Sequence, residues 1–140
     1  MGRKKYERVH KYRAWDEEKS RMSKPFSLGS QILVWETDIE DTFMPVEFFI
    51  RKQRGIIMQY VEIEDKNGIE IYEDYIVKHT DANGEKIGAV EWMNELNAFR
   101  IVFSKDSYYF IQDIDEVIGN KHENPELLEL LDNKGNKDEN

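Results

Sequence analysis

Hydrophobic and polar positions alternate with a period of two over residues 8–15 and 98–103, which is typical of β-strands with one buried face. Further strand-like runs, rich in apolar and β-branched residues, cover residues 56–63, 75–79 and 87–93. Turn-forming segments separate these runs, above all the Asn-Gly pairs within residues 65–68 and 81–85. The pattern predicts a mainly β fold, with a small antiparallel barrel-like core of short strands.

A C-terminal α-helix is predicted after the last strand-like run. Asn124 is a good N-cap residue, and Pro125 suits the first helical position. The apolar face that follows would suit packing on the barrel or between subunits, and it consists of Leu127, Leu128, Leu130 and Leu131.

The segment 27–55 has the weakest pattern in the chain. Its two apolar patches, 32–35 and 46–50, show no clean helical period, and acidic residues separate them. We expect two short strands or irregular segments here, with a short helix near 38–43 as a further option. A basic turn at 51–55 then leads into the central strand.

Three blocks of the sequence resemble the YopX-like family of phage and prophage proteins. They are an opening Lys-Tyr-Arg-Ala-Trp-Asp segment at 11–16, the central block 59–77 around Asp-Lys-Asn-Gly, and a C-terminal signature at 116–128. The resemblance covers most of residues 11–131 and implies a phage or prophage origin and a small β-rich fold. It implies no catalytic or ligand-binding residues.

The central block departs from the family pattern at one place. This chain has Asp74 and Tyr75 where members of the family usually have Gly-Asp. A glycine in that place indicates a turn with positive φ, which Asp tolerates better than most residues. We therefore predict that Asp74 has a left-handed backbone conformation.

Length and composition fit a small protein with one compact core. The 140 residues predict a single domain over 8–132, with a flexible basic arm at 1–7 and a disordered tail at 133–140. The absence of cysteine excludes disulfides and thiolate metal sites. No apolar run approaches the roughly 20 residues that span a bilayer, so no membrane association is expected. We expect a protein of the bacterial host cytoplasm.

Charge is distributed unevenly along the chain. Residues 1–24 hold nine Lys or Arg and four Asp or Glu, whereas the remaining 116 residues hold eleven and twenty-five. An acidic body disfavours contact with nucleic-acid phosphates, so nucleic acid is not the expected partner. The basic arm is interpreted as a solvated end of mixed charge, with a weak anchor for an acidic partner as the alternative.

No catalytic, cofactor-binding or metal-binding constellation is visible. His10, His79 and His122 lack the paired spacing of a zinc site, so we interpret them as surface or hydrogen-bonded histidines. The carboxylates of residues 62–74 are interpreted as a solvated strand face rather than as acid–base or metal-binding pairs. The chain has no Gly-rich phosphate loop and no Ser or Thr in a nucleophile-elbow context.

The aromatic residues allow two interpretations. They could stack on single-stranded nucleic acid, but acidic residues outnumber basic ones around the last two, so core packing is the better interpretation. The residues concerned are Trp15, Trp35, Trp92, Tyr108 and Tyr109.

The function that fits best is a non-enzymatic phage-derived accessory protein that binds a host or phage protein, or that assembles into a homo-oligomer. The candidate interaction residues are Asp74, Tyr75, Leu127, Leu128 and Leu131. Two alternatives are a nucleic-acid-binding protein that uses the basic arm, and an acidic DNA mimic that inhibits a host protein. A hydrolase, the fourth hypothesis, would need carboxylates clustered around a divalent ion.

Overall fold

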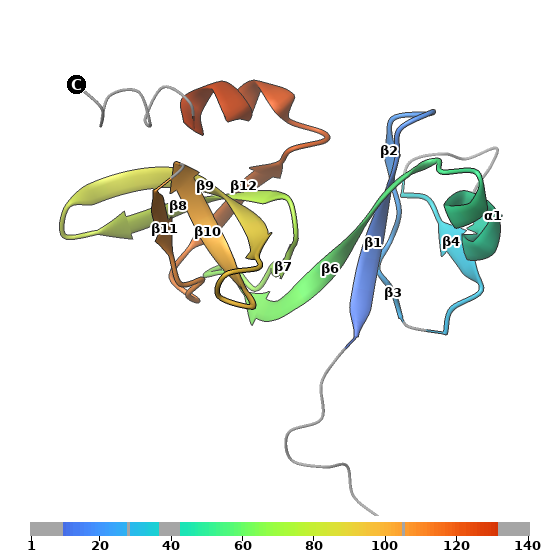
Figure 1. Ribbon diagram of the computed structural model, residues 1–140, viewed down its shortest axis with the longest axis horizontal. Helices are drawn as coiled ribbons and strands as arrows, with labels where there is room; N and C mark the ends of the chain where they lie inside the picture. The colour runs from blue at the N-terminus through green and yellow to red at the C-terminus, as the bar shows by residue number, and fades with distance from the viewer. Residues whose placement is uncertain (1–9, 28, 37–42, 105, 132–140) are drawn as a thin grey trace, which may run out of the picture. The chain divides into compact units, whose positions relative to one another are not determined.

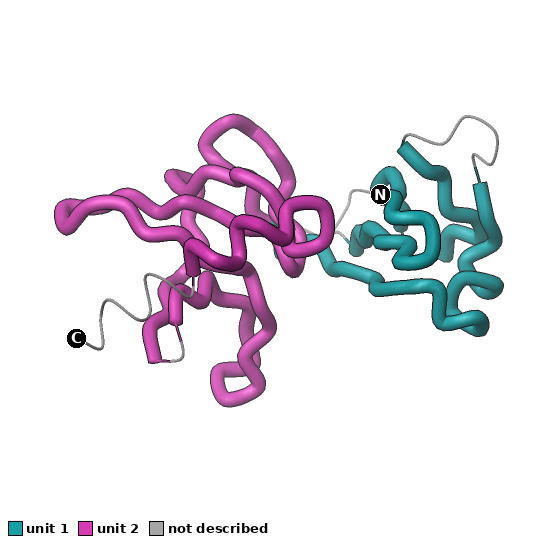
Figure 2. The backbone as a smooth tube through the Cα atoms, turned by 90° about the horizontal axis from the view of Figure 1, so that it is seen from above, with its two compact units in different colours: residues 1–62 teal, residues 63–140 magenta. Residues whose placement is uncertain are grey.

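The chain forms two compact units, residues 1–62 (unit 1) and 63–140 (unit 2), coloured separately in Figure 2. The structure is a computed structural model, and it describes residues 10–27, 29–36, 43–104 and 106–131. The expectations for the arm and the tail lie outside these residues. The single domain over 8–132 stays a prediction, because compactness alone does not test whether either unit folds independently.

Strand β1 (Lys11–Asp16) is the centre of unit 1 (Figure 1). It pairs antiparallel with β2 (Arg21–Met22) and β3 (Phe26–Ser27) on one edge and with β6 (Gly55–Glu64) on the other. The boundary between the two units falls within β6, which pairs at its far end with β7 (Glu70–Tyr72).

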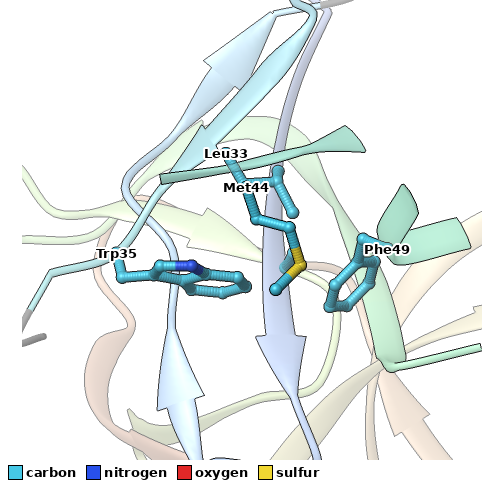
Figure 3. Packing of buried hydrophobic residues seen from close by; sticks show 5 residues of the cluster. Leu33, Trp35, Met44 and Phe49 are labelled. Carbon is cyan, nitrogen blue, oxygen red and sulfur yellow. The ribbon is translucent and has the colours of Figure 1, made fainter. Parts of the chain in front are cut away.

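The core of unit 1 is built from the segment with the weakest sequence pattern. Strands β4 (Ile32–Val34) and β5 (Phe43–Pro45) form an antiparallel pair, and helix α1 (Val46–Arg51) follows at once. Figure 3 shows that side chains of these three elements point toward one another, and the buried cluster contains Ala14, Leu33, Trp35, Met44 and Phe49.

The expected strand is confirmed for the patch 32–35, which contains β4, but it is wrong for the patch 46–50, which is helical. Its apolar residues lie in a helix of six residues, which is too short for a 3.6-residue period to show in the sequence. The alternative helix near 38–43 lies largely outside the described residues, and Phe43 belongs to a strand.

Unit 2 holds a five-stranded antiparallel sheet in the order β11-β10-β9-β8-β12. The bounds are β8 (Tyr75–Asp81), β9 (Gly84–Met93), β10 (Ala98–Ser104), β11 (Ser107–Tyr109) and β12 (Glu116–Asn120). The protein is mainly β, one sheet is a half-barrel, and a small helix lies near the C-terminus. The predicted fold class is confirmed.

Both Asn-Gly segments form turns, but only the glycines need positive φ. Gly68 has φ 80° and Gly84 has φ 110°, whereas neither Asn67 nor Asn83 has positive φ. Asp81 pairs with Gly84, so the β8–β9 loop has two residues, and the Asp81 carboxylate accepts a hydrogen bond from the Asn83 N–H. Asn83 thus stabilises the turn through its backbone rather than through a left-handed conformation.

The C-terminal helix begins as a 3-10 turn, η1 (Pro125–Leu127), and continues as α-helix to residue 131. Asn124 occupies the N-cap position and Pro125 the first helical position, both as predicted, but the Asn124 side chain makes no capping hydrogen bond. The Asn124 side-chain oxygen accepts a hydrogen bond from the Asn120 N–H at 3.1 Å, so it closes the preceding turn instead. None of the helices in the described segments combines the length and the apolar character needed to cross a membrane.

Candidate interaction surfaces

Asp74 has φ 70°, which confirms the predicted left-handed conformation. Its N–H donates to the Val90 carbonyl at 2.8 Å, and its own carbonyl accepts from the Lys121 N–H at 2.9 Å. Its carboxylate lies 2.9 Å from His122 Nε2 and 3.8 Å from the Lys121 ammonium. Asp74 therefore joins the central block to the C-terminal signature inside unit 2, and its partly buried side chain is already engaged.

The other candidate interaction residues mostly face the protein itself. Tyr75 is 5% exposed and its ring lies 5.6 Å from that of Tyr72. A Cβ atom on Gly119 would lie 2.9 Å from Leu127 Cδ1, which places that leucine directly on β12. Leu128 and Leu131 are half-buried. Within the described residues, the structure brings Asp74 and His122 together but offers little of Tyr75 to a partner.

His79 and Asp115 form a buried pair that no sequence pattern predicts. The Nδ1–H of His79 donates to Asp115 Oδ1 at 2.6 Å, and the two side chains are 2% and 0% exposed. The imidazole packs on Tyr109 with ring centroids 4.8 Å apart, and its buried Nε2 has no hydrogen-bond partner. The residues lie 36 positions apart, so only the tertiary fold reveals the pair.

Metal binding receives no support from these side chains. Among the residues that the structure describes, no three His, Asp or Glu side chains converge as ligands. The interpretation of the histidines as hydrogen-bonded residues is confirmed for His79 and His122.

The prediction that the carboxylates of residues 62–74 form a solvated face is wrong for Asp65. It is 4% exposed, and its side chain accepts hydrogen bonds from the N–H groups of Asn67, Ile69 and Val117. Burial alone would raise the pKa of Asp65, but these three bonds outweigh burial and hold its pKa below the usual value. Asp65 therefore has a structural role: it shapes the β6–β7 turn and fastens the turn to β12.

A second buried carboxylate organises unit 1. Asp16 is fully buried and accepts hydrogen bonds from Arg21 Nε at 2.9 Å and from Arg54 Nη2 at 2.8 Å. The Arg21 guanidinium in turn lies 4.1 Å from the Trp35 ring centroid. Burial would raise the pKa of Asp16, but the bonds from Arg54 and Arg21 outweigh it, and the pKa lies below its ordinary value. The carboxylate thus joins β1, β2 and the entry to β6.

The aromatic residues divide between core and surface. Trp15 and Trp35 are 9% and 2% exposed, as core packing predicts. That interpretation is wrong for Trp92, Tyr108 and Tyr109, which are 43%, 45% and 41% exposed. Tyr108 and Tyr109 lie on β11, the edge strand of its sheet, so their side chains have a neighbouring strand on one side only.

We use the name aromatic edge for Tyr108, Tyr109 and Phe110, which follow one another along and just after β11. Phe110 is 61% exposed, and the Arg100 guanidinium lies 4.5 Å from its ring centroid. Asp106 and Asp113 flank the aromatic edge in sequence and are both exposed. The aromatic edge is thus a run of three exposed aromatic residues with an exposed carboxylate on either side in sequence.

Unit 1 carries an exposed apolar surface of its own. The β4–β5 pair buries Leu33 and Met44 on its inner face, and it turns Ile32, Val34 and Phe43 to the opposite face. Ile32 is 47% exposed and Phe43 is 62% exposed. This pair of strands is therefore apolar on both faces, although only one is covered within unit 1.

The YopX protein family matches residues 11–129. The chain belongs to the YopX family. The fold of this YopX-family protein is similar to the crystal structure of protein EF1440 from Enterococcus faecalis, with a TM-score of 0.55 and 24% sequence identity. The alignment covers 86% of this chain and 98% of that chain. No curated protein matches the sequence. These findings show the family and the fold and assign no activity.

Proposed function

We propose that this YopX-family protein is a non-enzymatic accessory protein of phage or prophage origin, which acts in the host cytoplasm by binding another protein. The observation that carries the proposal is the aromatic edge of unit 2. Three consecutive aromatic residues lie 41% to 61% exposed at the end of a sheet. Exposed apolar patches are rare on monomeric proteins, and where they occur they usually mark an interaction site.

The composition of the aromatic edge is that of a protein interface. Tyr, Phe and Arg are enriched in interfaces, and Tyr and Arg dominate binding energies there. Arg100 packs over Phe110, and Tyr109 packs on the buried imidazole of His79. Because these contacts already order the side chains of the aromatic edge, those side chains lose less conformational entropy when a partner binds than unrestrained side chains would.

Catalysis receives less support than binding. The His79–Asp115 pair has the composition of a general-base pair, but its two side chains are 2% and 0% exposed. A substrate would need to displace the Tyr109 ring to reach the imidazole. Binding through the aromatic edge needs no such rearrangement.

Nucleic acid is the weaker partner for the same surface. Stacking on bases would need cations beside the rings to bind the phosphates. The aromatic edge is flanked by Asp106 and Asp113, and residues 63–140 hold nineteen Asp or Glu against eight Lys or Arg. Phosphate repulsion would oppose stacking, so a protein surface fits better. A DNA mimic would also act by binding a protein, through the acidic groups rather than the rings.

Site-specific photo-crosslinking in host cells that carry the phage or prophage tests this function. A benzophenone amino acid replaces Phe110 in one variant and Leu96 in a matched control. Leu96 is also an exposed apolar residue of unit 2, at 40%, and lies in the β9–β10 turn. We expect one protein to be crosslinked from position 110 and not from position 96. Equal labelling from both positions, or labelling from neither, would refute the proposal, and crosslinked nucleic acid at position 110 would support the alternative.

A further inference from the structure

A groove borders the apolar face of the β4–β5 pair in unit 1. Its volume is about 570 Å³, within the range of pockets that hold small ligands or single large side chains. The groove is lined by Lys11, Lys24, Phe26, Ile32 and Val34, together with small polar residues and a proline. Among the described residues that line it, two are cationic and none is acidic.

The two lysines of the groove, Lys11 and Lys24, differ in their surroundings. The Lys11 ammonium lies 5.6 Å from the centroid of the Tyr60 ring, whereas Lys24 is exposed at the start of the Pro25–Phe26 segment. Lys24 therefore gives the groove a cation that can meet an incoming ring or carboxylate. A fitting ligand would have an aromatic or aliphatic side chain with a negative charge beside it.

The aromatic edge of unit 2 has this chemistry. Phe110, its most exposed member, is followed three positions later by the exposed carboxylate of Asp113. The two units also differ in overall charge, since residues 1–62 hold twelve Lys or Arg and ten Asp or Glu, against eight and nineteen in residues 63–140. Unit 1 is thus weakly positive and unit 2 strongly negative, so the two surfaces are complementary in both polarity and sign.

We propose that the unit 1 groove of one copy of this protein binds the aromatic edge of a second copy, with Phe110 in the groove and Asp113 beside Lys24. The inference rests on the proposed function, because it names a second copy as a partner of the aromatic edge. Since the two surfaces differ, the copy that supplies the groove keeps a free aromatic edge after pairing, and the copy that supplies the aromatic edge keeps a free groove. Such heterologous contacts build rings or filaments rather than stopping at a symmetric dimer.

Sedimentation velocity of the full chain measures the association directly. We expect the weight-average mass to rise with protein concentration up to about 1 mM, where a contact with a Kd of about 1 mM is half-saturated. Added salt should reduce it, because salt screens the pairing of exposed charges. Phe110→Ser should lower the mass at every concentration. A monomer throughout this range would overturn the inference.

Charge reversal tests the pairing itself. Lys24→Glu places two carboxylates together across the interface, and Asp113→Lys places two ammonium groups together, so each should weaken self-association by about tenfold or more. The double variant K24E/D113K restores an opposite-charge pair, as does an equal mixture of the two single variants. Both should recover association.

Lys52→Glu is the matched control, because Lys52 is an exposed lysine of unit 1 that does not line the groove. It makes the same change in net charge as Lys24→Glu and should leave association unchanged. Equal losses from the two lysine variants, or no recovery in the double variant, would refute the specific pairing.

The crosslinking experiment separates this inference from the proposed function. A monomeric chain that still crosslinks another protein from position 110 would refute self-association and leave the protein-binding function intact. Self-crosslinking from position 110 between differently tagged copies would support both.

Discussion

Removal of the Asp16 carboxylate should destabilise unit 1 severely. In Asp16→Ala two guanidinium groups lose their shared acceptor while their side chains remain only 3% and 11% exposed. Because the Asp16 carboxylate is fully buried, water cannot easily take its place as the acceptor for Arg21 and Arg54. The variant should therefore unfold more readily than a simple loss of packing volume would predict.

The expected magnitude comes from the burial of the network. Removal of one partner from a buried ion pair costs about 3–5 kcal/mol, because it leaves an uncompensated charge. Asp16→Asn keeps the size and one accepting oxygen, so we expect a smaller loss of about 1.5–3 kcal/mol for weakened bonds to charged groups. With a urea m-value of about 1–3 kcal/mol/M, the midpoint for Asp16→Ala should fall by about 2 M.

Urea unfolding followed by tryptophan fluorescence is the appropriate assay. In a Trp92→Phe background the remaining tryptophans, Trp15 and Trp35, both lie in unit 1. Trp35 also contacts the Arg21 guanidinium, so its emission reports on the network itself. The unfolding signal then belongs to the unit that holds the substitution.

Glu18→Ala provides the control within the same network. Glu18 pairs with Arg54 at 3.1 Å but is 65% exposed, and surface pairs contribute about 0–1 kcal/mol. The free energies of unfolding should follow the order wild type, Glu18→Ala, Asp16→Asn, Asp16→Ala, from most to least stable. A loss in Asp16→Ala no larger than that in Glu18→Ala would contradict the reasoning.

Two further predictions concern Asp74 and acid stability. Asp74→Ala should lower the free energy of unfolding by about 1–2 kcal/mol or more, because Ala is strained at φ 70° and loses the pair with His122. Asp74→Gly should lie closer to wild type in thermal unfolding, and equal losses in the two variants would rule out backbone strain as the cause. The depressed pKa values of Asp16 and Asp65 stabilise the fold above pH 3.8, and this stabilisation is lost as the pH falls through their lower folded-state values. Acid titration by circular dichroism should therefore show a smaller pH-dependent loss for Asp16→Asn than for wild type, and identical curves would count against this role.

Local sequence signals predicted the local structure well. Apolar and β-branched content marked the long strands β6 and β9, and alternation marked β10, whose two sides are buried to different extents. The presence of Asp74 where the family usually has glycine predicted its positive φ, since glycine is the usual residue where the backbone needs a left-handed conformation.

Features that depend on distant residues were not predictable in this way. Asp16 meets Arg54 from 38 positions away, and His79 meets Asp115 from 36. A helical or strand pattern spans fewer than about 20 residues, so neither pair falls within one pattern. The exposure of Tyr108 and Tyr109 follows from the place of β11 at the end of its sheet, and strand order is set by the whole chain. The candidate surface was missed for that reason.

The hydrogen bond from Val117 to Asp65 bears on the order in which unit 2 folds. It joins residues 52 positions apart, so it forms only after the intervening strands have taken their places. We expect this contact to be absent from the folding transition state, because the entropy lost in closing a long loop is not yet offset by other contacts there. Loss of the Asp65 carboxylate should then speed unfolding and leave the folding rate nearly unchanged, which the two arms of a chevron plot would distinguish. The carboxylate would serve as a latch on the finished unit, and its contribution to the lifetime of the native state would exceed its contribution to reaching it.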